Sequence, residues 1–226
     1  MRGYFIAGTD TEIGKTTIAA ALAKSLADSG KRVGVMKPIA SGSEQTPEGL
    51  RNEDALALID AAGQGQDYAS VNPYAYEPPI APHVAAELAG ETIDIDRIVT
   101  LAGEVEAAND LIIVEGVGGF HVPLGPGTDT ADLAVRLGLP VILVVGLRLG
   151  CINHALLTQE AIKARGLELA GWVANAVDPS MAVQDANVKA LEDRLEAPML
   201  GRFPRLDSPS ATEFARLLGN VSARLA

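Results

Sequence analysis

A lysine and two threonines directly follow a glycine near the start of the chain, in the segment Gly8–Thr17. An apolar run precedes this segment and a helix-like stretch follows it. A glycine-bearing loop between a strand and a helix exposes backbone N–H groups, and the start of the helix adds partial positive charge, so such a loop can hold a phosphate. In this arrangement Lys15 reaches the terminal phosphates of a nucleotide, and the Thr16 hydroxyl coordinates Mg²⁺.

The spacing of this segment departs from the Walker A pattern at one position. The pattern G-x-x-x-x-G-K-[ST] places its first glycine at residue 9, where this sequence has Thr9, and Gly8 stands one residue early. The second half of the pattern, Gly14–Thr16, is intact and lies between a predicted strand and a predicted helix. We therefore predict a phosphate-binding loop rather than an ordinary turn with an exposed Lys15.

Two further apolar runs end in a charged side chain. Lys37 closes the run 32–37, and Glu115 closes the run 111–115. In an open parallel sheet, the residues at and just past the carboxyl ends of the strands line the crevice in which ligands bind. Lys37 is thus a candidate to neutralise charge on a transferring phosphoryl group, and Glu115 resembles a Walker B carboxylate. A strand-terminal lysine in solvent is the alternative for Lys37.

A second carboxylate that could face a metal ion is Asp54, at the opening of a helix-like segment. An acid in this position is also favoured by the helix dipole alone, so Glu115 is the stronger candidate of the two. The glycines in Gly116–Gly119, directly after Glu115, allow the backbone to approach a ligand closely.

Short apolar runs alternate with longer helix-like segments along the chain. Continuous hydrophobicity is typical of strands that are covered on both faces, as in a parallel sheet. The alternation predicts an α/β fold, doubly wound, with a mostly parallel sheet and helices on both faces, and we expect residues 1–226 to form a single P-loop NTPase-like domain. The expected strands are Tyr4–Gly8, Arg32–Lys37, Leu111–Glu115, Val141–Gly146 and Leu169–Ala176. The expected helices are Lys15–Ser29, Asn52–Ala62, Asp96–Ala107, Asp129–Leu137, Ile152–Ala164 and Ala186–Leu195.

Glycines and prolines mark several boundaries in this pattern. Gly30, Gly138 and Gly166 each lie just past a predicted helix, where a left-handed residue is favoured. The segment Gly63–Pro82 contains four prolines and is the long irregular stretch of the sequence. A lid or substrate loop and a plain surface connection are equally open interpretations of it.

The composition bears on partners and location. The chain has 18 Lys and Arg against 29 Asp and Glu, a net charge of −11, which repels phosphate backbones and anionic lipid. Neither nucleic acid nor a membrane surface is therefore an expected partner. Cys151 is the one cysteine, so an intrachain disulfide is excluded, and the start of the chain has no signal-peptide features. The longest apolar run, Pro140–Gly146, is too short to cross a bilayer, and we expect a cytoplasmic protein.

Taken with these segments, the chain resembles the dethiobiotin synthetase family over nearly its whole length. The resemblance implies an ATP-dependent ligase that converts 7,8-diaminononanoate and CO₂ or bicarbonate to dethiobiotin. One amine takes up CO₂ as a carbamate, ATP phosphorylates the carbamate, and the neighbouring amine closes the cyclic urea, releasing ADP and phosphate. The most specific blocks are Gly8–Glu12, Lys37–Ser43, Thr46–Asn52, Gly150–Ala155 and Ala170–Asn175.

The resemblance also implies roles for individual residues. Lys37 and Lys15 become the catalytic cations on the carbamate and the γ-phosphate, and Thr16, Asp54 and Glu115 become the Mg²⁺ ligands. The implied nucleotide-binding residues are Glu12, Ile13, Gly14, Lys15, Thr16, Thr17, Asp54, Glu115, Gly116, Val117, Gly118, Asn175, Ala176, Pro204, Arg205 and Leu206. Asn175 would contact adenine, since its amide is both donor and acceptor. At Arg205 we do not assume the family's usual residue, which leaves the base contacts there less well defined.

The family also implies where the diamine binds. Ser41 becomes a contact on the diamine side. The substrate carboxylate would bind the free N–H groups at a helix start formed by Gly150, Cys151, Ile152 and Asn153. In the family this helix start comes from the other subunit of a homodimer, so the active site would lie at the interface.

Two other classes of protein share parts of this pattern. Partition-type P-loop ATPases, which act by binding partners, carry an extra lysine near the start of the loop, where this chain has Asp10. They often end in a basic membrane-binding helix, whereas the tail Ala211–Ala226 contains only Arg216 and Arg224 as basic residues. A small-metabolite kinase would lack the Lys37–Ser43 block. The three histidines do not share metal-ligand spacing, and we expect structural or surface roles for His83, His121 and His154.

Overall fold

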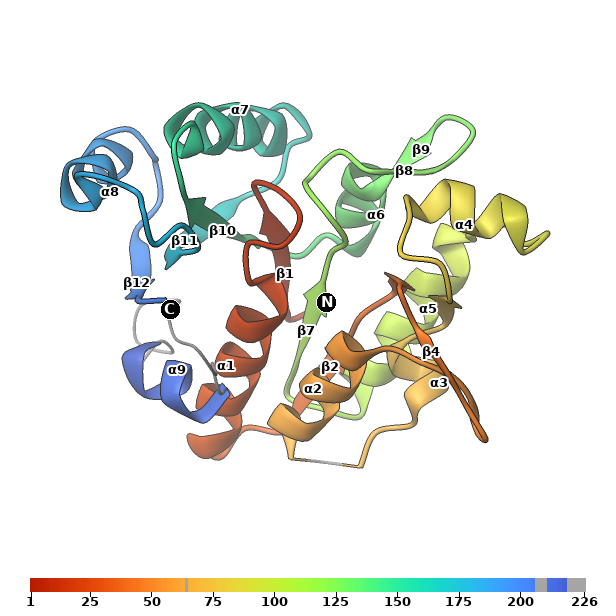
Figure 1. Ribbon diagram of the computed structural model, residues 1–226. Coiled ribbons are helices and arrows are strands. Elements are labelled where there is room, and N and C mark those ends of the chain that lie inside the picture. Colours follow the sequence, from red (N-terminus) through yellow and green to blue (C-terminus); the bar gives the residue numbers. More distant parts are fainter. Residues whose placement is uncertain (64, 206–210, 219–226) are drawn as a thin grey trace.

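A computed structural model describes residues 1–63, 65–205 and 211–218 of the chain. Leu206 and Arg224, both named above, lie outside these ranges. A six-stranded parallel sheet with the order β12-β11-β10-β1-β7-β2 forms the centre of the molecule (Figure 1). Its strands are β1 Gly3–Gly8, β2 Val33–Met36, β7 Leu111–Glu115, β10 Val141–Leu147, β11 Leu169–Ala176 and β12 Met199–Phe203.

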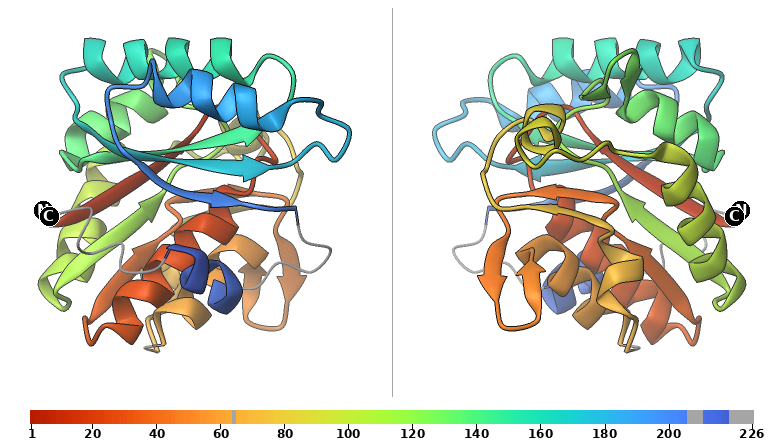
Figure 2. Two further views of the ribbon diagram at one scale, coloured as in Figure 1. Left: turned by 90° about the vertical axis from the view of Figure 1, so that its left-hand side faces the viewer. Right: turned by 90° about the vertical axis from the view of Figure 1, so that its right-hand side faces the viewer.

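Helices cover both faces of this sheet, which is why the strands are continuous apolar runs. Successive residues of β1 enter different cores: Ile6 packs into one, and Phe5 and Ala7 pack into the other. Figure 2 shows the sheet between these two helical layers. One layer contains α1 Lys15–Asp28, α2 Glu53–Ala62 and α9 Ala211–Leu218, and the other contains α5 Ile95–Ala107, α6 Thr130–Leu137, α7 Cys151–Ala164 and α8 Gln184–Glu192. None of the helices in the described ranges is long and apolar enough to span a lipid bilayer.

The expected doubly wound α/β architecture is confirmed. All five predicted strands and all six predicted helices are present, with ends shifted by three residues at most. The glycines placed after helices have the left-handed backbone expected of them, with φ of 89° at Gly30, 64° at Gly138 and 72° at Gly166. The edge strand β12 was not predicted, because Gly201 and the exposed Arg202 interrupt its apolar pattern.

Short elements at one end of the sheet fill in the segments that were left unassigned. The stretch Gly63–Pro82 contains a one-turn helix and a strand that pairs with the residues following Lys37. These smaller elements are β3 Ile39–Ser41, which pairs with β6 Tyr74–Tyr76; the hairpin of β4 Glu44–Thr46 and β5 Gly49–Arg51; the hairpin of β8 Pro123–Gly125 and β9 Thr128–Asp129; and the helices α3 Tyr68–Val71 and α4 Pro82–Leu88.

Candidate active site

Three adjacent parallel strands bring the charged residues to one edge of the sheet. The strand β1 ends at Gly8, β7 ends at Glu115, and β2 ends directly before Lys37. A cavity of about 780 Å³ opens at this edge, as the geometry of parallel sheets predicts. The sequence-predicted residues that line it are Glu12, Gly14, Lys15, Thr16, Thr17, Lys37, Ser41, Asp54, Glu115, Val117 and Gly118.

The loop after β1 leads into α1 through a glycine that no other residue could replace without strain. Gly14 has a φ of 83° and caps the helix. A Cβ atom built on it would lie 2.3 Å from Asn175 Nδ2, so both the backbone angle and the available space require glycine. Helix α1 then begins at Lys15, and Lys15, Thr16 and Thr17 of its first turn line the cavity, as a phosphate-binding loop requires.

The side chain of Lys15 folds back over its own loop. Its Nζ donates to the backbone oxygen of Asp10 at 2.8 Å, and only 7% of the residue is exposed. Burial lowers the pKa of Lys15 to about 8, although Glu115 acts in the opposite direction. Among the described residues, Lys15 forms no ion pair with a carboxylate, so an anion placed in the cavity would stabilise its charged form.

Lys37 lies between two carboxylates. Its Nζ is 2.6 Å from Glu115 Oε1 and 2.8 Å from Asp54 Oδ2. Burial acts to lower the pKa of Lys37, but the two carboxylates outweigh it and raise the pKa, so this lysine stays charged. The solvent-exposed alternative for Lys37 is therefore wrong, because the residue is 3% exposed. Lys37 in turn lowers the pKa of Asp54 against the effect of burial.

The oxygen atoms around Lys37 fit a magnesium ion. Thr16 Oγ1 donates to Glu115 Oε1 at 2.8 Å, and the Glu115 carboxyl is fully buried. Burial raises the pKa of Glu115, and its Oε2 has no hydrogen-bond partner among the described residues. No group of three or more acidic, histidine or cysteine side chains that could hold a metal ion occurs in the described part of the chain. Two carboxylates and a hydroxyl suit Mg²⁺, which commonly completes its ligand shell with water and substrate phosphates.

With this geometry established, comparisons with known proteins assign the family. A family model described as an AAA domain matches residues 2–212. The ATP-dependent dethiobiotin synthetase of Aromatoleum aromaticum is 51% identical over 217 residues, which is 96% of each chain. The enzyme of the same name from Pseudomonas paraeruginosa is 53% identical over 207 residues, or 91% of each chain. The chain belongs to the dethiobiotin synthetase family.

Membership of this family makes the chain an ATP-dependent ligase of biotin biosynthesis, as the resemblance implied. Solved structures support the fold alone. The MinD cell division protein of Aquifex aeolicus has a TM-score of 0.63 and 18% identity, covering 100% of this chain and 96% of that one. MinD of Pyrococcus horikoshii in complex with Mg-ADP has a TM-score of 0.62 and 17% identity, covering 100% and 98%. At such identities the cell-division role named for these proteins does not transfer to this family member.

The described residues among those expected around adenine, Asn175, Ala176, Pro204 and Arg205, lie at the ends of β11 and β12, and none of these four lines the cavity. Asn175 Nδ2 donates to the backbone oxygen of Ile13 at 2.8 Å, which ties β11 to the phosphate loop. Arg205 Nη1 donates to the oxygen of Val177 at 2.6 Å. Ala176 closes β11 and Pro204 follows β12. The adenine contacts stay a prediction.

Two residues that were expected to bind nucleotide, Ile13 and Gly116, do not line the cavity and instead pack against neighbouring residues. Ile13 is buried and lies against Gly146, where an added Cβ would be 2.5 Å from Ile13 Cγ2. Gly116 lies against Phe5, whose Cζ would be 3.0 Å from an added Cβ. Both positions hold the loops that border the cavity in place.

The helix start expected to bind the substrate carboxylate is formed, but it lies outside the cavity of its own chain. Gly150 caps α7 with a φ of 96°, and Cys151 is 1% exposed, in line with the packing role expected for it. None of Gly150, Cys151, Ile152 and Asn153 lines the cavity. The preceding Leu149 is 93% exposed.

Several residues of the site escaped the sequence reasoning. Pro79, Ile80, Ala81 and Pro82 line the cavity, so the end of the long irregular stretch borders the site. Its prolines were the available signal, but they fit a surface connection equally well. An ion pair between Arg148 and Asp10 also links the loop before α7 to the phosphate loop.

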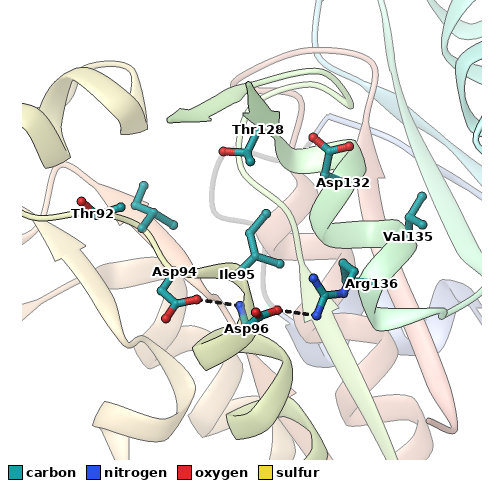
Figure 3. A pocket seen from close by; sticks show the side chains of 9 residues that line it. Thr92, Asp94, Ile95, Asp96, Thr128, Asp132, Val135 and Arg136 are labelled. Atoms are coloured by element: carbon teal, nitrogen blue, oxygen red, sulfur yellow. Dashed lines mark hydrogen bonds and ion pairs between the residues drawn. The ribbon is translucent and has the colours of Figure 1, made fainter. Parts of the chain in front are cut away.

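A second hollow of about 690 Å³ lies between α5 and α6, and its charged side chains already pair with one another or cap a helix (Figure 3). Its arginine, Arg136, is already paired with Asp96. Asp94 accepts hydrogen bonds from the first turn of α5 as its N-cap. The polar groups of this hollow therefore serve helix packing, and no sequence-predicted site residue lines it.

Proposed function

We propose that this ligase closes the cyclic urea of dethiobiotin from 7,8-diaminononanoate and CO₂, using ATP. The amine adds to CO₂ and loses a proton to give a carbamate. The carbamate oxygen takes the γ-phosphoryl group from ATP, releasing ADP, and the second amine displaces phosphate and loses its proton as the ring closes. The observation that carries the proposal is the ion pairing of Lys37 with Glu115 and Asp54 beside the phosphate loop, which raises the pKa of the lysine and favours its charged form.

The side chains at this edge of the sheet contribute position and charge, because the reaction needs no covalent enzyme intermediate. Lys15 and the N–H groups at the start of α1 bind the phosphates. Lys37 stabilises the negative charge shared by the carbamate and the transferred phosphoryl group. Ser41 Oγ is buried, has no hydrogen-bond partner among the described residues, and lines the cavity, which supports a contact with the diamine.

Thr16, Asp54 and Glu115 would hold Mg²⁺. The ion supplies neutralisation of the phosphate charges when it is bound. The support from this chain is the buried Oε2 of Glu115, which has no hydrogen-bond partner among the described residues, while Oε1 of the same carboxyl accepts from the Thr16 hydroxyl. Adenine would pack beside Asn175, whose Oδ1 is left for the base while Nδ2 holds Ile13.

A homodimer completes the site in this proposal. The start of α7 carries no acidic residue in its first turn, so its N–H groups suit the substrate carboxylate. These N–H groups do not reach the cavity of their own chain. The exposed apolar side chains of Leu149 and Leu157, 93% and 56% exposed, lie before and within this helix and suit burial against a second copy.

The proposal is tested by measuring ADP release with each substrate left out in turn. We expect release to fall at least about tenfold without 7,8-diaminononanoate, and likewise without bicarbonate, because the phosphoryl acceptor is then missing. Mass spectrometry should find one dethiobiotin per ADP. ATP turnover indifferent to the diamine would rule out the proposed reaction and favour a switch-type ATPase.

A further inference from the structure

The backbone of Lys37 is held by a segment far from it in sequence. The last pair of β2 with β7 joins Met36 to Val114, so Lys37 has already left the sheet. Its N–H donates instead to the oxygen of Val71 at 2.9 Å. Its carbonyl accepts from the side chain of Asn72, whose Nδ2 lies 2.7 Å away. Residues 71 and 72 thus clamp both polar backbone groups of Lys37.

Asn72 is part of a largely buried chain of hydrogen bonds that runs through the half-buried Tyr68. Asn72 is 4% exposed, and its Nδ2 also donates to the oxygen of Tyr74 at 3.2 Å. Its Oδ1 accepts from the hydroxyl of Tyr68 at 2.8 Å. The same hydroxyl accepts from the backbone N–H of Asn52 at 2.7 Å. The Tyr68 hydroxyl therefore links the clamp on Lys37 to Asn52.

Asn52 extends this chain to the other side of the cavity. Its Oδ1 accepts from the N–H of Asp54 at 3.1 Å and so caps α2. Its Nδ2 donates to the oxygen of Ser41 at 3.4 Å. The start of α2 carries Asp54, one of the two carboxylates that flank the Lys37 ammonium. Two buried asparagines and the half-buried Tyr68 thus reach the backbone at Lys37, Asp54 and Ser41.

We propose that Asn52, Tyr68 and Asn72 form a positioning network that fixes Lys37, Asp54 and Ser41 relative to one another for the reaction. The proposal rests on the proposed function for what Lys37 acts upon. A lysine side chain has four rotatable bonds, so the place of its ammonium depends on a fixed backbone origin. Fully satisfied buried networks are rigid, and a displacement of about 1 Å can cost roughly a hundredfold in rate.

The test compares two matched tyrosine-to-phenylalanine variants. Tyr68→Phe breaks the network, leaving the Asn52 N–H and Asn72 Oδ1 without their partner. Tyr74→Phe is the control. The hydroxyl of Tyr74, like that of Tyr68, accepts a hydrogen bond from one backbone N–H, but this N–H belongs to Asp94, at 3.0 Å, and lies outside the network. Each ring also has an arginine over its face, Arg51 at 4.3 Å for Tyr68 and Arg97 at 5.2 Å for Tyr74.

We expect Tyr68→Phe to lower kcat by about thirtyfold while the KM for ATP changes less than about twofold, since the phosphate loop is untouched. The Mg²⁺ concentration for half-maximal rate should rise as Asp54 shifts. Tyr74→Phe should lower the melting temperature with kcat within about twofold of wild type. Asn72→Asp, which keeps the acceptor for Tyr68 but loses the donor to Lys37, should lower kcat in the same way as Tyr68→Phe.

The outcomes separate this proposal from the proposed function. If wild-type ADP release ignores the diamine, the function fails, whatever the variants do. If wild type depends on the diamine but Tyr68→Phe and Tyr74→Phe keep equal kcat values, the network is merely structural and the proposal is overturned. An equal loss of kcat in both tyrosine variants would overturn it as well, because the effect would then follow stability alone.

Discussion

The two lysines of the cavity occupy opposite electrostatic environments. Lys15 has a backbone carbonyl as its close partner, and burial lowers its pKa to about 8. Lys37 is buried still more deeply, yet its pKa is raised, because Glu115 and Asp54 lie within 3 Å of its ammonium. Burial alone therefore does not decide the charge of a lysine here. The difference comes from the carboxylates at the ends of β7 and the start of α2.

This difference gives each lysine a separate task. In the free protein the positive charge of Lys15 is only weakly stabilised, because its close partner is a backbone carbonyl. The charged form becomes favourable when a polyphosphate lies on the loop. The raised pKa of Lys37 favours its charged form, and its position depends on carboxylates that are themselves fixed by the sheet and the helix cap. Lys15 is suited to binding nucleotide, and Lys37 to stabilising charge that develops during transfer.

Removing Lys37 should give the largest effect. In Lys37→Ala we expect kcat for ring closure to fall roughly a thousandfold, since the cation beside the transferred group is lost, while ATP still binds through the Lys15 loop. Steady-state kinetics and ATP titration calorimetry measure these two quantities. A variant with near-normal turnover would remove Lys37 from the mechanism.

The same variant has a stability signature that serves as its control. Without the ammonium, the buried carboxyl of Glu115 loses the partner that opposes the effect of burial, so its pKa rises further above the ordinary value. A carboxyl with a raised pKa binds more protons in the folded state, and the free energy of unfolding then falls as pH rises. The melting temperature of Lys37→Ala should drop further below that of wild type at pH 8 than at pH 5.

A change in the loop that carries Lys15 should give the second largest effect. In Gly14→Ala the new Cβ would lie 2.3 Å from Asn175 Nδ2 and the residue would need a φ of 83°. We expect ATP affinity to fall about a hundredfold, roughly 3 kcal/mol, because the loop must shift away from Asn175. Nucleotide titration measures this loss.

Gly30→Ala is the matched control for that change. Gly30 has a φ of 89°, but nothing lies within 4 Å of an added Cβ. The Gly30→Ala substitution should cost only the strain of a left-handed backbone at an alanine, about 1–2 kcal/mol of stability. The ATP affinity should stay unchanged. If Gly14→Ala behaved like Gly30→Ala, close packing of the loop against Asn175 would have no part in nucleotide binding.

The difference between the two lysines also shows how far the sequence alone leads. Strand ends can be recognised from apolar runs, so the sequence alone assigns Lys37 and Glu115 to the same edge of the sheet. The phosphate loop was equally predictable from Gly14–Thr16, because strand, loop and helix are contiguous.

What could not be predicted depends on contacts between distant segments. The pairing of β3 with β6 brings residues 71–74 beside Lys37, and no local pattern records that pairing. Asn72 and Tyr68 therefore looked like parts of an irregular stretch. The opposite pKa shifts of the two lysines were also out of reach, because they depend on distances between elements that lie far apart in the sequence.

The pH dependence of ATP binding should show the smallest effect and tests Lys15 directly. Its pKa is about 8 in the free protein, and a bound polyphosphate raises it, so binding takes up a proton. We expect ATP affinity to fall about tenfold from pH 7 to pH 9, and about half a proton to be taken up per ATP at pH 8. Calorimetry in two buffers with different ionisation enthalpies measures that uptake.

Lys15 should also affect the stability of the nucleotide-free protein. Its pKa is about 8 in the folded protein and 10.5 in the unfolded chain, so between pH 8 and 10.5 the unfolded chain binds more protons. The contribution of Lys15 to the free energy of unfolding should therefore increase as pH rises through this window. Lys15→Arg, which stays charged throughout, should flatten both trends. Equal pH dependence in Lys15→Arg and wild type would show that another group is responsible, and the contrast between the two lysines would lose its electrostatic basis.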